Sequence, residues 1–477
     1  MAYHAFLHFG AFVKIDRPAT AKNIGENSTG LYPPAMAHVK NFGAVGDGKT
    51  DDTAELQHAI NDGERLIVIP AGTYRITKPL VVDLDKTGFT GISGDGGTAA
   101  IVMDGPGPAL RLVGTHGGTA DPGSVKPNVW QSQRMPTVSG IEIVGNHPEA
   151  IGIQLERTMQ ATLTGVLIRK CKIGIHLITR NRNPIISNCH IYDGAGKGAI
   201  GIYLDGCDLH QINIIGCHIS YHRHAGIKLQ RSSVRNLQIT GCDIEYNFDA
   251  EEIDCADVWI DAREAEVREV TISSCTIQAK YSPAGANIRI EAAPTEQSTE
   301  AGLWTISGNI ITNQTHNLLL RNCRGVTVTG NTFGTAAART ILIERCRNLV
   351  VGSNNLDYNP DYKGPRIDGV LVKDSTGINL HGLIIESSQA GTAKADGAIG
   401  IFNSSDITVA NCQILNPKHR ALHLDNVHHA VISANLVRDH GRAPTMQEAV
   451  LVNGGHNLEF PGNLLDKGRR GKMTKAQ

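Results

Sequence analysis

The sequence is poor in aromatic residues and almost neutral in charge. Phe, Trp and Tyr make up 5% of its 477 residues, and 45 Lys and Arg oppose 46 Asp and Glu, for a formal net charge of −1. Such a balance argues against a protein built mainly to bind nucleic acid or an anionic membrane surface. The chain also lacks an apolar run of 18 residues, which excludes a transmembrane helix. Glycine, in contrast, is abundant, with 52 residues, and this directs attention to internal repeats.

Two further signals are missing. The apolar stretch 5–13 has no basic leader and no small-residue cleavage site after it, so we do not interpret it as a signal peptide. A cytoplasmic protein and a trimmed secreted form both fit. The ten cysteines show no C-x-x-C spacing, which argues against a zinc site built from cysteines.

A short turn motif recurs along the chain, with an apolar residue at each end and Cys or Asn at its fourth position. Its copies begin at Ile186, Ile214, Ile239, Ile272, Ile306, Val328, Val409 and Ile432. Alternating apolar segments accompany the motif, at 201–205, 226–230, 257–261, 287–291 and 317–321. These segments start 25 to 31 residues apart, which is typical of one coil of a solenoid. Because alternation with period two indicates strands, the sequence predicts an all-β fold, a single parallel β-helix of about a dozen coils.

The cysteines follow the same repeat. Six occupy the turn motif or its equivalent: Cys171, Cys189, Cys217, Cys242, Cys275 and Cys412. Three occupy a second recurring turn: Cys207, Cys323 and Cys346. We expect them to be small buried hydrophobic residues in internal ladders.

The N-terminal part resembles a known family. The segment 42–53 (FGAVGDGKTDDT), followed by 68–74 (VIPAGTY), resembles the opening of the pectate-lyase-like superfamily, which includes rhamnogalacturonase-like and epimerase-like proteins and glycoside hydrolases. The resemblance implies a right-handed parallel β-helix. We therefore expect an irregular segment at 1–38, a β-helix domain at 39–466 whose N-terminal end is capped by a short helix at 54–62, and a tail at 467–477. Related β-helices also form homotrimers, so a homotrimer is a possible assembly.

In this superfamily the substrate lies on the outer face of the strand that follows the longest loop of each coil. The long loops here are 192–199, 220–225, 245–256 and 278–286. Strand alternation then predicts two outward columns on the strands of successive coils. The first is Gln154, His176, Tyr203, Lys228, Trp259, Arg289 and Leu319. The second is Glu156, Ile178, Asp205, Gln230, Asp261, Glu291 and Arg321.

These columns predict a groove for a polysaccharide or oligosaccharide, because aromatic faces stack on sugar rings and cations bind carboxylates or hydroxyls. The expected substrate-binding residues are His176, Tyr203, Trp259, Arg289, His222, His224, Glu245 and Tyr246. A third outward column, His190, His218 and Asp243, is expected to be structural or to form the rim of the groove.

For catalysis we favour cleavage of glycosidic bonds, as a hydrolase or transglycosylase, by Asp205, Asp261 and Glu291. Asp205 and Asp261 are two coils or about 9.6 Å apart, as in inverting enzymes, whereas Asp261 and Glu291 are about 4.8 Å apart, as in retaining enzymes. The sequence alone does not choose between these pairs.

Two alternatives stay open. The first is a uronate lyase with Lys228 as base and Arg289 or calcium as the cation, although flanking carboxylates would raise the pKa of Lys228. The second is a non-catalytic glycan-binding module of the adhesin or tailspike kind. We expect no cofactor unless the lyase needs calcium. The catalytic motifs of polygalacturonases and the Arg-x-Pro-x-x-Arg signature of many pectate lyases are absent, so these roles rest on the direction in which the side chains point.

Overall fold

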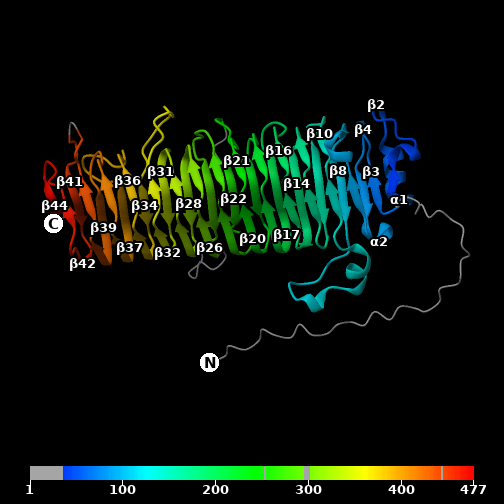
Figure 1. The fold of residues 1–477 in the computed structure, drawn as a ribbon. Coiled ribbons are helices and arrows are strands. Elements are labelled where there is room, and N and C mark those ends of the chain that lie inside the picture. Colours follow the sequence, from blue (N-terminus) through cyan, green and yellow to red (C-terminus); the bar gives the residue numbers. More distant parts are fainter. Residues whose placement is uncertain (1–35, 252–253, 295–300, 442–443, 477) are drawn as a thin grey trace, which may run out of the picture. The chain divides into compact units, whose positions relative to one another are not determined.

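Parallel strands stack coil upon coil along the chain. The structure, a computed structural model, describes residues 36–251, 254–294, 301–441 and 444–476. Within the described residues the strands line three faces of a solenoid, and each strand pairs in parallel with the equivalent strands of the coils before and after it (Figure 1). This arrangement confirms the predicted parallel β-helix.

The first face follows the long loops. Its strands are β5 (Leu80–Asp83), β8 (Gly107–Val113), β11 (Ala150–Glu156), β14 (Ile173–Arg182), β17 (Ile200–Ile215), β19 (Ala225–Gln230), β22 (Ala256–Ala262), β25 (Ala286–Ala292), β28 (Gln314–Arg321), β31 (Ala336–Glu344), β34 (Val370–Lys373), β37 (Ile399–Ala410), β39 (Leu422–Ser433), β41 (Glu448–Asn453) and β44 (Gly471–Ala476).

The second face comes next along each coil, and the long strands β17, β37 and β39 continue into it. Its other strands are β1 (Met36–His38), β3 (Leu66–Val68), β6 (Gly91–Ser93), β9 (Thr137–Ser139), β12 (Thr162–Thr164), β15 (Ile185–Ser187), β20 (Val234–Thr240), β23 (Val267–Ser273), β26 (Ala301–Ser307), β29 (Arg324–Thr329), β32 (Arg347–Gly352), β35 (Thr376–His381) and β42 (His456–Glu459).

The third face is a separate sheet of 16 short strands, where the sequence predicted about a dozen coils. The first of these coils lack the Cys or Asn turn motif by which the others were counted. The strands are β2 (Asp47–Asp51), β4 (Gly72–Ile76), β7 (Ala99–Met103), β10 (Glu142–Gly145), β13 (Leu167–Arg169), β16 (His190–Tyr192), β18 (His218–Ser220), β21 (Asp243–Glu245), β24 (Thr276–Gln278), β27 (Ile310–Thr312), β30 (Thr332–Phe333), β33 (Asn355–Leu356), β36 (Ile384–Glu386), β38 (Gln413–Leu415), β40 (Leu436–Arg438) and β43 (Leu464–Leu465).

Helical elements are few. They are α1 (Thr53–Asp62), α2 (Leu84–Thr87), the 3-10 turns η1 (Val39–Phe42), η2 (Asp95–Gly97) and η3 (Pro122–Ser124), and one π turn, η4 (Val129–Gln133). No helix among the described residues is long and apolar enough to cross a membrane.

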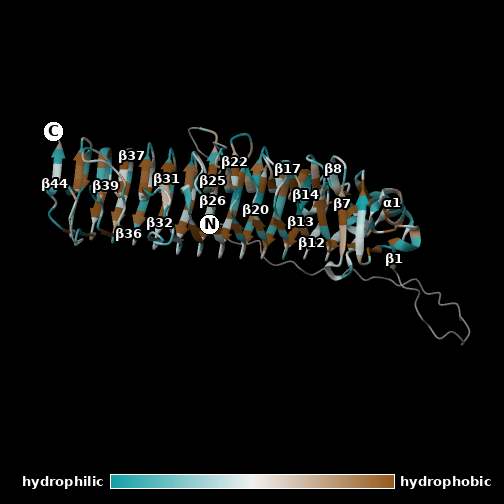
Figure 2. Cartoon of the chain, turned by 90° about the horizontal axis from the view of Figure 1, so that it is seen from above, coloured by the Kyte–Doolittle hydropathy of each residue, from teal (hydrophilic) through white to brown (hydrophobic). Residues whose placement is uncertain are grey.

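The core is one continuous column of aliphatic side chains inside the coils. The alternate residues predicted to point inward, such as Ile227 and Leu229, are fully buried there. Apolar strand segments recur from coil to coil along the stack (Figure 2). All ten cysteines are buried, which confirms the prediction for the nine that the turn pattern placed.

Both ends of the solenoid differ in part from expectation. Met36–His38 form β1 and pair with β3, so the coils begin before residue 39; residues 1–35 lie outside the described part of the chain. At the other end, β44 pairs with β41, so the segment predicted as an irregular tail contains a strand. This pairing provides hydrogen-bond partners for the backbone N–H and C=O groups of the last coil, and the composition of the segment does not reveal it.

Candidate functional site

The two outward columns of the first face exist in the predicted register. Tyr203 lies beside Lys228, Lys228 beside Trp259, and Trp259 beside Arg289. In the second column Asp261 lies directly beside Glu291. The repeat therefore identified which residues of successive coils are neighbours.

These columns do not form an open groove in this structure. Tyr203 is 9% exposed, Lys228 and Arg289 are each 7% exposed, and Trp259 is 4% exposed. Residues of the long loops bind over them: Asp254 accepts a hydrogen bond from Arg289 Nη1 at 2.6 Å. The side chains point away from the core as expected, but the loops and their own neighbours cover them.

Each of the predicted catalytic carboxylates is held by arginine. Asp261 accepts from Arg263 Nε at 2.7 Å and from Nη2 at 2.6 Å. Although burial raises the pKa of Asp261, the hydrogen bonds and charge of Arg263 outweigh it and hold that pKa below its ordinary value. Asp205 binds Arg231 and lies 3.5 Å from His176 Nε2. The expectation of a protonated acid is therefore not met at Asp261.

Glu291 belongs to a chain of ion pairs. Its Oε2 accepts from Arg289 Nε at 2.7 Å, and its Oε1 accepts from Arg321 Nη1 at 2.8 Å; Arg321 also binds Glu344. Calcium prefers several free oxygen ligands, and here both oxygens of Asp261 and of Glu291 are occupied by guanidinium groups. These residues do not fit a calcium ion.

Lys228 is the most unusual group on this face. Its Nζ lies 2.7 Å from His224 Nε2 and 4.3 Å from the ring centre of Trp259, whose ring also contacts the Arg289 guanidinium at 4.3 Å. Burial lowers the pKa of Lys228 to about 8, and this outweighs the opposing effect of Asp261. The expectation that carboxylates raise this pKa was wrong, because loss of hydration dominates at a covered position.

The histidines predicted to bind substrate have structural partners. His176 stacks on Tyr203 with ring centres 5.5 Å apart, and Tyr203 donates to Gln230 Oε1 at 3.0 Å. His222 is 2% exposed and bonds to Asn247, and burial lowers its pKa to about 4. Burial likewise lowers the pKa of His224 to about 4. Both loop histidines are neutral at physiological pH.

Glu245 and Tyr246 lie elsewhere, at the end of β21 on the third face. Tyr246 stacks on Tyr221 with ring centres 5.4 Å apart, and the Lys280 ammonium lies 5.5 Å from the centre of its ring. Tyr246 also lines a pocket of about 390 Å³ among the long loops. We call this the tyrosine pocket; its lining includes Tyr246, Phe248, Lys280, Tyr281, Tyr362 and Lys363.

Sequence reasoning missed most of the tyrosine pocket. Tyr281 is 47% exposed and Tyr362 is 40% exposed, which is unusual for large aromatic side chains. Tyr281 lies in a loop that was singled out for its length, and its tyrosine was the available signal. Tyr362 lies in a separate loop more than 80 residues further on, and no repeat connects the two.

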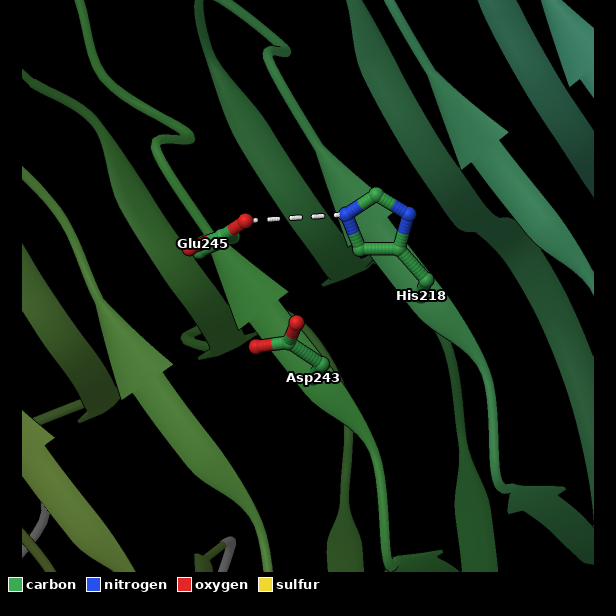
Figure 3. A group of neighbouring side chains, drawn as sticks. All are labelled: His218, Asp243 and Glu245. Carbon is green, nitrogen blue, oxygen red and sulfur yellow. Dashed lines mark ion pairs between the residues drawn. The ribbon is translucent and has the colours of Figure 1, made fainter.

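The third outward column contains a cluster of titratable side chains. His218 from β18 faces Asp243 and Glu245 from β21, and His218 Nε2 lies 3.7 Å from Glu245 Oε1 (Figure 3). One nitrogen or oxygen from each of the three side chains lies within 4.8 Å of the others. Imidazole and carboxylates are common ligands of divalent cations.

Comparison with known families agrees with the fold. Residues 36–114 match the family described as rhamnogalacturonase A/epimerase, pectate lyase-like. Overlapping matches to the right-handed β-helix region cover 128–279, 201–393 and 296–472. The second family therefore spans well over half of the chain and establishes the right-handed coil.

Individual relatives are distant or partial. A probable glucan endo-1,3-beta-glucosidase of Arthroderma benhamiae is 32% identical over 93 residues, which cover 17% of this chain and 10% of that protein. A mutant tailspike protein of E. coli bacteriophage HK620, solved with a pentasaccharide, is 14% identical, with a TM-score of 0.52 over 89% of this chain and 80% of its own.

The pre-mature gene product 12 of bacteriophage phi29 is also 14% identical, with a TM-score of 0.55 over 90% of this chain and 56% of its own. At such identities the solved structures share the fold. With the family matches, they lead to one conclusion: this chain belongs to the right-handed β-helix proteins of the pectate-lyase-like superfamily.

Proposed function

We propose that this protein is a carbohydrate-active β-helix protein that binds a polysaccharide in the tyrosine pocket and cleaves its glycosidic bonds. The observation that carries the proposal is the pocket itself, in which Tyr246, Tyr281 and Tyr362 gather from three loops. The names of the relatives, a glucan glucosidase and a tailspike solved with a pentasaccharide, agree with a carbohydrate ligand.

The chemistry of the pocket suits a sugar. Tyrosine rings offer flat apolar faces to the C–H side of a sugar ring, and their hydroxyls offer polar contacts at the rim. Lys280, Lys363, Asn313 and Gln314 add hydrogen-bonding groups at the same surface. The pocket has a volume of about 390 Å³, which can accommodate one or two sugar units of a longer polysaccharide.

The proposed reaction centre lies on the neighbouring first face. The loop that carries Tyr246 leads directly into β22, which carries Asp261. Asp261 is ionised and suits a base or nucleophile, whereas Lys228, with a pKa of about 8, is mainly protonated at pH 7 and suits a proton donor. Asp205 and Glu291 remain proposed members of this centre.

The lowered pKa of Lys228 also favours a second candidate, a uronate lyase. Above pH 8 its free amine could remove the proton next to a uronate carboxylate, with the Arg289 guanidinium as the nearby cation. The two reactions have opposite pH dependence. Hydrolysis with Lys228 as acid slows as the pH rises through about 8, whereas elimination with Lys228 as base accelerates.

Product analysis on a panel of neutral and uronate-containing polysaccharides tests the reaction. New reducing ends without ultraviolet absorbance support hydrolysis, and an unsaturated uronate chromophore supports the lyase. We expect Asp261→Asn to abolish hydrolysis while glycan binding remains. Full activity in this variant would contradict the proposed centre, and binding without cleavage across the panel would leave a glycan-binding module.

Tyr281→Ala tests the binding site separately. The variant loses one aromatic ring that would stack on the sugar. Because such a stacking interaction contributes about 1 kcal/mol, we expect glycan binding to weaken roughly fivefold. Trp130→Ala is the matched control, because Trp130 is 40% exposed and does not line the pocket. Equal affinity for the wild type and Tyr281→Ala would remove the tyrosine pocket from the proposal.

A further inference from the structure

The third face places three potential metal ligands on neighbouring strands. In the parallel pairing of β18 with β21, His218 lies beside Asp243 and Ser220 lies beside Glu245. The residues between them, Ile219 and Ile244, are fully buried in the core. Strand alternation therefore directs all four polar side chains outward, and Figure 3 shows His218 facing both carboxylates.

The distances between the potential ligand atoms of this cluster are close to those found around a bound metal ion. Ligand atoms from His218, Asp243 and Glu245 lie within 4.8 Å of one another. In a tetrahedral zinc site, with metal–ligand distances near 2.1 Å, the ligand atoms lie roughly 3.4 Å apart. The strands hold the three backbones in place, so closing this difference requires only rotation of the side chains.

Ser220 provides an independent observation. Its side chain is on the same outward face, next to Glu245, and is 0% exposed, yet its Oγ finds no hydrogen-bond partner among the described residues. A buried hydroxyl without a partner is unfavourable, because it has lost its hydrogen bonds to water. A cation held by Glu245, with its bound water, would supply that partner.

We propose that His218, Asp243 and Glu245 bind one divalent transition-metal ion of the zinc class. An imidazole ligand disfavours calcium and magnesium, which prefer oxygen alone, and suits zinc. Three protein ligands leave a fourth position open to water or to a hydroxyl of a bound molecule. This inference goes beyond the proposed function, since it concerns metal binding and does not depend on glycan cleavage.

Calorimetric titration of the chelator-stripped full-length protein with Zn²⁺ and, in parallel, Ca²⁺ tests the site. We expect one tight zinc equivalent in the wild type, weakened at least tenfold in His218→Asn and in Glu245→Gln. His190→Asn is the matched control, because His190 lies one coil away with its ring 5.9 Å from that of His218 and is not a proposed ligand. We expect this control to bind zinc like the wild type.

Two outcomes would overturn the proposal. One is the same zinc titration for the wild type, His218→Asn and Glu245→Gln, which would place bound zinc elsewhere, for example at His428 and His456, whose rings are 4.2 Å apart. The other is calcium bound more tightly than zinc and lost in the same variants. Thermal melting of each variant verifies folding, and a Co²⁺ absorption band that disappears in Glu245→Gln gives a second readout.

Discussion

Asp257 is a carboxyl group enclosed within the protein. It is 0% exposed; its Oδ1 accepts from the backbone N–H and the side-chain amide of Asn247, and its Oδ2 accepts from Asn287 Nδ2 at 2.9 Å. Burial raises the pKa of Asp257 well above its ordinary value. The folded protein therefore retains a proton at this site at pH values where the unfolded chain has lost it.

This difference makes stability depend on pH. Above about pH 4 the unfolded chain releases the proton of Asp257 while the folded state keeps it, so the free energy of unfolding falls as the pH rises. Asp257→Asn removes this loss, and Asn287 Oδ1, which has no partner among the described residues, can accept from the new amide after a flip. We expect the free energy of unfolding of Asp257→Asn to be higher than that of the wild type by about 1 kcal/mol or more at pH 7. At pH 4 we expect the two free energies to be nearly equal.

Urea unfolding at pH 4 and pH 7 measures this difference in the free energy of unfolding between Asp257→Asn and the wild type. Asp361→Asn serves as the control, because Asp361 is exposed and should show no such pH-dependent gain. If Asp257→Asn were stabilised over the wild type by as much at pH 4 as at pH 7, the protonation of Asp257 would not be the cause of the pH dependence.

At the scale of elements, an amide ladder connects the turns between the second and third faces. Asn309 Nδ2 donates to Asn331 Oδ1 at 3.0 Å, and Asn331 Nδ2 donates to Asn354 Oδ1 at 3.0 Å. Asn331 Oδ1 also accepts the backbone N–H of Asn309. Each side chain thus satisfies buried groups of the coil before it and the coil after it.

Asn331→Ala should interrupt this ladder. The change leaves the backbone N–H of Asn309 without its acceptor and removes one of the two donors to Asn354 Oδ1, which keeps the backbone N–H of residue 331. We expect a cost of about 1–3 kcal/mol. Asn355→Ala, at an exposed position of β33, should change stability by less than about 0.5 kcal/mol. Denaturant midpoints of the two variants measure the contrast, and similar losses would show that the ladder contributes no special stability.

At the scale of the whole molecule, a solenoid must close its ends. Helix α1 packs against β5 and η1 and buries Leu56, Ala59 and Ile60. Asp52 holds the preceding loop, because its carboxylate accepts the backbone N–H groups of Val45 and Gly46. The predicted cap is present, and it covers strand edges that could otherwise pair with another chain.

Leu56→Asp should open this end. Burying a carboxylate in place of a leucine that is 1% exposed costs about 3–5 kcal/mol locally, so the cap detaches and the first coils become available for association. Light scattering after size-exclusion chromatography should show concentration-dependent oligomers, absent in the exposed control Asn61→Asp. An unchanged elution profile for Leu56→Asp would contradict a protective role. The wild-type profile also tests the predicted homotrimer.

The candidate site was predictable in its registers and not in its contacts. Lys228, Trp259 and Arg289 were identified as neighbours because equivalent positions of successive coils must lie side by side. Their burial was not predictable, since it depends on how the loops fold over them. Arg263, the partner of Asp261, and Arg231, the partner of Asp205, lie just after strands where the alternating pattern ends, whereas the partners of Glu291 lie in the predicted columns.

The amino-acid sequence by itself determined the parallel coils, the inward and outward residues, the buried cysteines and the N-terminal cap. The first three features follow from a local period, because repetition imposes the same geometry on every coil, whereas the cap follows from the family resemblance of 42–53 and 68–74. Only the tertiary structure decided that the first face is covered, that Tyr246, Tyr281 and Tyr362 share a pocket, and that burial lowers the pKa of Lys228. Such features arise from loops and hydration, which differ from coil to coil and follow no repeat.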